Sequence, residues 1–201
     1  MNGGETSSNA GFGVKLQKAA VSGDTNRIEM LIKAGAPIEG TDPNGRTALH
    51  WAAGWSPRPV MDLLLEKSGH ETINMKDSEG RTAMHLAAMQ GHREVVKALS
   101  AKGGKINIRD NEGYTPLHLA AGLGRNNMVR MLLDCGADPN MRSTDDMTSL
   151  HLAALYGTRG TVEVLIKHGA KQDVTDSHGK TPLDYAKETE DKRIIEYLTS
   201  L

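Results

Sequence analysis

The stretch Asp110-Asn-Glu-Gly-Tyr-Thr-Pro-Leu-His-Leu-Ala-Ala121 recurs along this chain of 201 residues. Related stretches of twelve residues begin upstream at Asp42 and Asp77, and downstream at Ser143 and Asp176. The motif threonine recurs at steps of 35, 33, 33 and 33 residues, as Thr47, Thr82, Thr115, Thr148 and Thr181. A fixed period of this size predicts an array of similar units, each of which packs mainly on its neighbours.

One internal unit shows how the pattern specifies a pair of helices. Thr115 can cap a first helix, and Pro116 can occupy its first position, where a missing N–H does no harm. Leu117, Ala120 and Ala121 follow at helical spacing and form one buried stripe. A second amphipathic helix and a glycine stop signal complete the unit.

The period and the recurring Thr-Pro/Ala-Leu-His-x-Ala-Ala core resemble the ankyrin-repeat family. The resemblance implies an all-α fold, an α-solenoid of six stacked helix-turn-helix repeats with β-turn fingers and polar capping repeats. The expected repeats are 12–44, 45–79, 80–112, 113–145, 146–178 and 179–201. Residues 1–11 are small and polar, so we expect a disordered N-terminal tail before a complete ankyrin-repeat domain at 12–201.

Two sets of recurring residues are expected to be structural. The turn glycines supply positive φ and are Gly45, Gly80, Gly113 and Gly179. Asp146 takes this slot in the fifth repeat, either as an acidic contact or by simple drift. The motif histidines are expected to hydrogen-bond to their own threonine or to a neighbouring turn, and they are His50, His85, His118 and His151. Because no Cys or second His accompanies them at ligand spacing, we expect no metal site.

Composition narrows the function. The chain is 38% hydrophobic and 24% charged with a formal net charge of −1, so it offers no general attraction to nucleic acid or to an anionic membrane. It contains no apolar run of about 18 residues, and its single cysteine, Cys135, cannot form an intrachain disulfide. We find no catalytic constellation and no phosphate-binding loop, and so expect neither enzyme activity nor a cofactor. A monomer in the cytoplasm, or also in the nucleus, is the expected state.

The resemblance implies that a partner protein or peptide binds a concave face formed by the turn tips and the inner helices. Two slots of the repeat are expected to face solvent there. The slot between the turn glycine and the threonine holds Arg46, Arg81, Tyr114 and Met147, and Asp145 precedes it in the fifth repeat. The slots after the alanine pair hold Trp55, Met89, Leu123, Leu155 and Tyr156. Apolar and aromatic residues at such positions indicate a contact surface.

Other interpretations remain open at this point. Some of these side chains could fold back onto the inner helices as part of the core. The face could instead hold a nucleotide or another small ligand, or it could block the active face of a partner enzyme. The chain could also be an array without one dedicated partner, or a fragment of a longer protein.

Overall fold

The computed structural model describes residues 5–55 and 58–201, with side chains from Gly13 onward. It divides the chain into two compact units, Met1–Lys105 and Ile106–Leu201. The described residues form thirteen helices and no strand, which confirms the all-α fold expected from the repeat.

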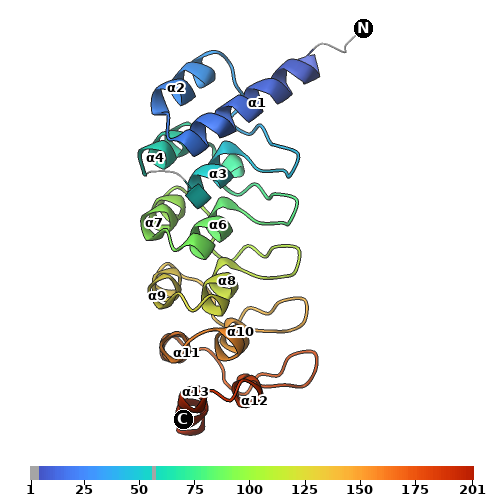
Figure 1. The fold of residues 1–201 in the computed structure, drawn as a ribbon, viewed down its shortest axis with the longest axis vertical. Coiled ribbons are helices and arrows are strands. Elements are labelled where there is room, and N and C mark those ends of the chain that lie inside the picture. The colour runs from blue at the N-terminus through green and yellow to red at the C-terminus, as the bar shows by residue number, and fades with distance from the viewer. Residues whose placement is uncertain (1–4, 56–57) are drawn as a thin grey trace. The chain divides into compact units, whose positions relative to one another are not determined.

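The first unit contains three helix pairs and one additional helical turn. Its inner helices, α1 (Glu5–Ser22), α3 (Ala48–Trp55) and α6 (Ala83–Gln90), pack on one another in that order. Its outer helices, α2 (Thr25–Lys33), α4 (Arg58–Lys67) and α7 (Arg93–Ala101), form a second row beside them. Figure 1 shows these two rows and the long finger loops that project from the inner row. The extra turn, α5 (His70–Ile73), lies in the loop that carries the two additional residues of this repeat.

The second unit repeats the arrangement. Its inner helices are α8 (Pro116–Gly122), α10 (Ser149–Tyr156) and α12 (Pro182–Glu188). Its outer helices are α9 (Asn126–Asp134), α11 (Arg159–Lys167) and α13 (Lys192–Thr199). α10 packs between α8 and α12, and α11 packs between α9 and α13, so each repeat contacts its neighbours through both of its helices.

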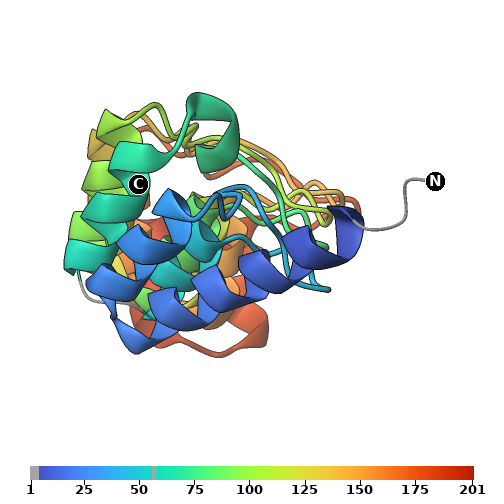
Figure 2. The same ribbon diagram turned by 90° about the horizontal axis from the view of Figure 1, so that it is seen from above.

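The first inner helix differs from its sequence prediction. We expected residues 1–11 to be disordered, but α1 begins at Glu5, and only residues 1–4 lie outside the described part of this tail. Figure 2 shows α1 extending toward the side on which the finger loops of the first unit project. Small polar residues carry no apolar periodicity, which is why the pattern placed the start of this helix near Gly13.

Pairs of small residues allow the inner helices to approach one another closely. In both units the alanine pairs are almost fully buried, and they are Ala52, Ala53, Ala87, Ala88, Ala120, Ala121, Ala153 and Ala154. The outer helices contribute larger side chains, such as Leu64 in the first unit and Leu132 in the second, both with 0% exposure. Full burial of one such leucine contributes about 1.5–3 kcal/mol, so each helix pair is held mainly by apolar packing.

The finger loops are tight turns built around an acidic side chain. In one of them, Oδ1 of Asp77 accepts hydrogen bonds from the N–H groups of Glu79 and Arg81, at 3.0 and 2.9 Å. The turn glycines have φ between 74° and 79°, at Gly45, Gly80, Gly113 and Gly179. Asp146 adopts φ of 58° in the same slot, and the hydroxyl of Ser143 replaces the turn carboxylate. The fifth finger therefore keeps its shape, and an aspartate accepts the left-handed conformation.

Successive fingers and loops are tied together by polar links. Within the first unit the N–H of Ser78 donates to the carbonyl of Asn44, and within the second unit Thr144 and Ser177 donate to Glu112 and Asp145. In the loops between an outer helix and the next finger, asparagines recur at the repeat period as Asn74, Asn107 and Asn140. The amide of Asn140 donates to the carbonyl of Gly169 at 3.0 Å and accepts from the N–H of Lys171 at 2.9 Å. Each asparagine thereby fastens the loop of the following repeat.

Candidate functional site

The motif histidines are neutral bridges between neighbouring repeats. In the second unit the N–H of Thr115 donates to Nδ1 of His118 at 3.2 Å. Because Nδ1 accepts this bond, the proton lies on Nε2, which donates to the carbonyl of Met147 at 3.1 Å. His151 bridges to Lys180 in the same way, and His50 of the first unit bridges to Arg81. Both predicted kinds of bond, to the threonine and to the next turn, are therefore made together.

Burial determines the charge state of these rings. It lowers the pKa of His118 from 6.5 to about 4, and it also lowers the pKa values of His50 and His151. Both nitrogens of each bridging ring are engaged in hydrogen bonds, so neither is available as a metal ligand. Within the described residues, His, Cys, Asp and Glu side chains form no cluster that could hold a metal ion.

Gln17 performs the same bridging role in the first repeat. Its side-chain amide donates to the carbonyl of Arg46 at 2.9 Å and to the carbonyl of Gly40 at 3.1 Å. The glutamine therefore preserves the link to the next finger, although the motif has otherwise drifted in this repeat. Gln17 thus reproduces the bond to the next finger that Nε2 makes in the histidine repeats.

Two predicted contact residues, Arg46 and Arg81, are held by carboxylates of the finger that contains Arg81. Nε of Arg46 lies 3.2 Å from Asp77, and its Nη2 lies 3.5 Å from Glu79. Arg81 forms an ion pair with the other oxygen of Glu79. The guanidinium of Arg46 therefore joins two successive fingers, and that of Arg81 pairs with the same Glu79 within its own finger.

Three predicted residues are exposed at the same position of three different repeats. The side chains of Trp55, Leu123 and Tyr156 are 50%, 55% and 68% exposed. Each lies at the C-terminal end of an inner helix: Trp55 ends α3, Leu123 caps α8 and Tyr156 ends α10. The repeat geometry therefore presents a large apolar side chain to solvent at this slot in both units.

The other predicted contact residues are less accessible. Met89, Tyr114 and Leu155 are half-buried. Met147 is only 9% exposed, so the expectation that its slot faces solvent is wrong for this residue. The reason is that an apolar side chain at this slot can pack into its own repeat, whereas the arginines at the same slot keep a charged end near the surface.

Tyr114 lies in an acidic environment in the second unit. Burial, followed by the charges of Glu112, Asp145 and Asp110, raises the pKa of its hydroxyl. Its ring centroid lies 5.8 Å from that of His118, which places the tyrosine against the inner helix. Tyr114 thus lies near both the exposed carboxylate of Asp145 and Tyr156.

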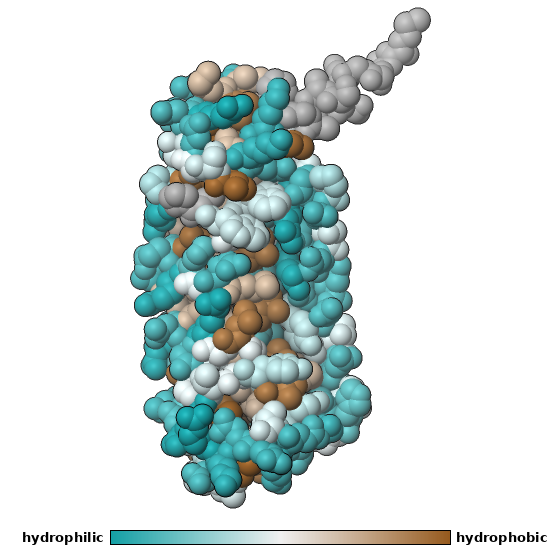
Figure 3. All heavy atoms as spheres, in the orientation of Figure 1, coloured by the Kyte–Doolittle hydropathy of each residue, from teal (hydrophilic) through white to brown (hydrophobic). Residues whose placement is uncertain are grey.

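Figure 3 shows the surface along the inner helices. In each unit, apolar and near-neutral side chains gather there, between hydrophilic side chains of the outer helices and of the finger loops. This pattern, an apolar strip bordered by polar residues, is typical of surfaces that bind other proteins.

Sequence reasoning missed the role of the aromatic residues that replace the motif leucine. Trp51 donates through Nε1 to Oδ2 of Asp42 at 3.0 Å, and Tyr185 donates through its hydroxyl to Oδ2 of Asp176 at 2.5 Å. This hydrogen bond raises the pKa of Tyr185 to about 12. The signal was present in the sequence, because an aromatic residue occupies a leucine slot only in the second and last repeats.

Comparison with known proteins agrees with this geometry. Models described as "Ankyrin repeats (3 copies)" match residues 13–77 and 60–143, and one described as "Ankyrin repeats (many copies)" matches residues 132–186. The chain is also 34% identical over 59 residues to the eye-specific diacylglycerol kinase of Drosophila melanogaster. That match covers 29% of this chain and 4% of the kinase.

Ankyrin repeats are generally protein–protein interaction modules and typically have no catalytic activity of their own. Within residues 5–55 and 58–201, no helix has the length and apolar character needed to cross a membrane. The family models together extend from residue 13 to residue 186. This chain is a member of the ankyrin-repeat family.

Proposed function

We propose that this protein is a non-catalytic interaction module that binds a partner protein or peptide through the C-terminal ends of its inner helices and the adjacent fingers. The observation that carries the proposal is the repetition of exposed apolar side chains at one slot. Among the described residues, six large hydrophobic side chains are exposed, and three of them are Trp55, Leu123 and Tyr156. Chance exposure would not concentrate them at one position of the repeat.

The fold does not require an apolar residue at this slot. Gln90 occupies it in the third repeat and is exposed at the end of α6. Leaving a tryptophan or tyrosine in water forgoes about 25 cal/mol for each Å² of apolar surface that a partner could cover. Residues of these types often supply most of the binding energy at protein interfaces. The exposed side chains are therefore best explained by a partner that buries them.

The test uses the chain's own polar alternative. We would replace Trp55 by Gln in one variant, and Leu123 and Tyr156 by Gln in a second, so that each unit is tested by itself. The control is Met30→Gln, because Met30 is 71% exposed on the outer helix α2. Affinity capture from a lysate of the source organism, quantified by mass spectrometry, would compare the four proteins.

We expect wild type and Met30→Gln to capture the same specific proteins, and at least one slot variant to lose them while keeping its helical circular dichroism. Equal capture by all four proteins would place the binding surface elsewhere and contradict the proposal. Loss with Met30→Gln alone would indicate that the outer helices form the contact surface.

A further inference from the structure

The first unit contains an apolar groove between α1, α3 and the finger that precedes α3. Its volume is about 390 Å³, and its lining includes Val14, Lys18, Val21, Pro43 and Trp51. Val14, Lys18 and Val21 are spaced four and three residues apart, so they lie on one face of α1. This volume falls at the lower end of the range of about 300–1,000 Å³ that is usual for ligand pockets. The groove can therefore accept one or two side chains.

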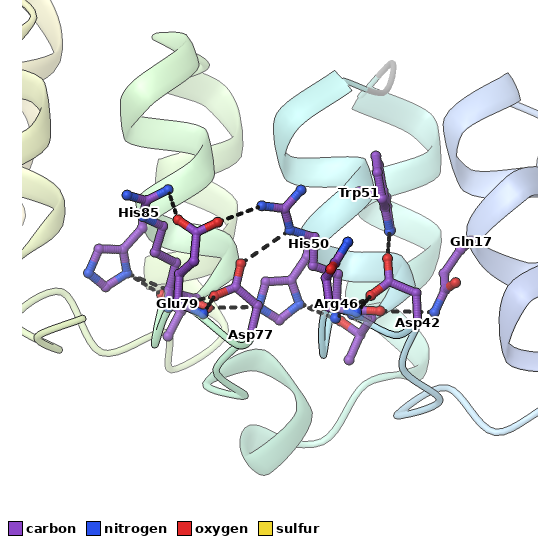
Figure 4. A network of polar contacts seen from close by, with 12 residues as sticks. Gln17, Asp42, Arg46, His50, Trp51, Asp77, Glu79 and His85 are labelled. Atoms are coloured by element: carbon purple, nitrogen blue, oxygen red, sulfur yellow. Dashed lines mark hydrogen bonds and ion pairs between the residues drawn. The ribbon is translucent and has the colours of Figure 1, made fainter. Parts of the chain in front are cut away.

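Trp51 provides a fixed apolar wall for the groove. The equivalent slot holds a leucine in the next three repeats, as Leu86, Leu119 and Leu152. The indole N–H donates a hydrogen bond to Asp42. The centroid of the indole lies 5.1 Å from the ring centroid of Trp55. It also lies 5.6 Å from Cζ of Arg46. Figure 4 shows the indole held by Asp42 beside Gln17 and Arg46. A wall held in this way loses little conformational freedom when it is covered.

The charges at the rim indicate the chemistry of the occupant. The negative charge of Asp42 is stabilised by three neutral donors, with Oδ1 accepting from the N–H groups of Asn44 and Arg46 and Oδ2 accepting from Trp51. The charge of Arg46 is offset by two carboxylates of the next finger. In the described part of the chain, the exposed ammonium of Lys18 forms no ion pair. A positive charge thus borders an apolar groove, and a carboxylate beside an apolar side chain would complement it.

We propose that this groove binds a segment of a partner protein in which a bulky apolar side chain stands close to an aspartate or glutamate. The apolar side chain packs between Val14, Val21 and Trp51, and the carboxylate approaches Lys18. The site goes beyond the interaction face proposed above, because it uses α1 and the wall formed by Trp51. The ring of Trp55 packs against Trp51 but does not line the groove.

The probe is a library of random dodecapeptides displayed on phage and selected on the immobilised protein. From wild type we expect enrichment of sequences that pair Leu, Phe or Trp with Asp or Glu. Trp51→Leu installs the residue of the sister repeats and should weaken binding of a selected synthetic peptide about tenfold or more, measured by fluorescence polarisation. Lys18→Gln should weaken it about two- to fivefold, the range that an exposed ion pair supports.

The decisive variant is Lys18→Glu, which changes only an exposed side chain. Its selection should favour Lys or Arg where the wild-type selection favours Asp or Glu. The proposal would be overturned by an unchanged acidic preference in this variant, by equal affinity of Trp51→Leu, or by no enrichment on wild type. Circular dichroism and urea unfolding would establish that each variant is folded.

A second comparison separates this site from the proposed interaction face. The Leu123→Gln/Tyr156→Gln variant alters only the second unit and should bind the selected peptide as wild type does. If that variant loses cellular partners but keeps the peptide, both proposals stand. If this variant and Trp55→Gln both keep the partners while Lys18→Glu switches peptide preference, only the interaction face is refuted.

Discussion

Acid should weaken this protein through its buried motif histidines, and His118 allows the effect to be quantified. The ring is 0% exposed and remains neutral in the folded protein until the pH approaches its pKa of about 4. In the unfolded chain the same ring takes up a proton near its ordinary pKa of 6.5. Between these values the unfolded state binds more protons, so the free energy of unfolding falls as the pH is lowered.

The size of the effect follows from the two pKa values. A difference of one unit corresponds to about 1.4 kcal/mol, so complete protonation of the unfolded ring costs about 3 kcal/mol of stability below pH 4. About 2 kcal/mol of this loss of stability falls between pH 7 and pH 5, a range suited to unfolding measurements. Asp184, whose pKa is lowered by the backbone N–H and the hydroxyl of Thr181, loses its contribution only below 3.8, outside this window.

The substitution His118→Gln tests this reasoning because Gln17 shows that a glutamine at this position can donate to the next finger. Urea unfolding of wild type and variant, followed by circular dichroism at pH 7 and pH 5, gives the difference in stability at each pH. We expect this difference to change by about 2 kcal/mol in favour of the variant at the lower pH. His178→Gln, at an exposed finger position, is the control and should parallel wild type. If the stability of His118→Gln fell with pH as steeply as that of wild type, the predicted role of His118 would be refuted.

Four further substitutions, in three tests, probe individual contacts in the second unit, each by its urea unfolding midpoint. Ser149→Ala should stabilise by about 1 kcal/mol, because the buried hydroxyl has no hydrogen-bond partner among the described residues; a loss of stability would reveal a partner. Gly113→Ala should lower the stability clearly more than Gly179→Ala. An added Cβ at Gly113 would lie 2.7 Å from the N of Thr144, whereas one at Gly179 would meet nothing within 4 Å. Equal losses of stability would show that only the positive φ of the two positions matters. Asn140→Ala should cost about 1–2 kcal/mol through its two lost loop hydrogen bonds, and a neutral result would mean that solvent replaces them.

The repeat period predicted most of the fold. Thr115, Pro116 and the alanine pair placed α8 correctly because capping and close helix packing depend on local residue types. The start of α1 was missed, since Glu5–Gly11 carries no apolar periodicity. The asparagine links were also missed, although Asn74, Asn107 and Asn140 recur at the same period.

The candidate site was harder to predict than the fold. The slots of Trp55, Leu123 and Tyr156 follow directly from the motif, and these side chains are exposed. Met147 occupies an equivalent motif slot to Tyr114 but is buried, because the direction of a side chain depends on its size and on its neighbours. The groove beside Trp51 requires α1 and a finger to be placed together, which a single repeat motif does not describe.

The hydrogen bonds between neighbouring fingers and loops have a consequence for folding during translation. The bond from Thr144 to Glu112 spans 32 residues, and the bonds from His118 to Met147 and from Asn140 to Gly169 span 29 each. Within a unit, a repeat emerging from the ribosome can close its interface on the repeat made just before it. Contacts this near in sequence carry a small loop-closure cost and favour rapid folding. Each unit can therefore assemble stepwise during translation, and its partially made forms expose only one unfinished interface at a time.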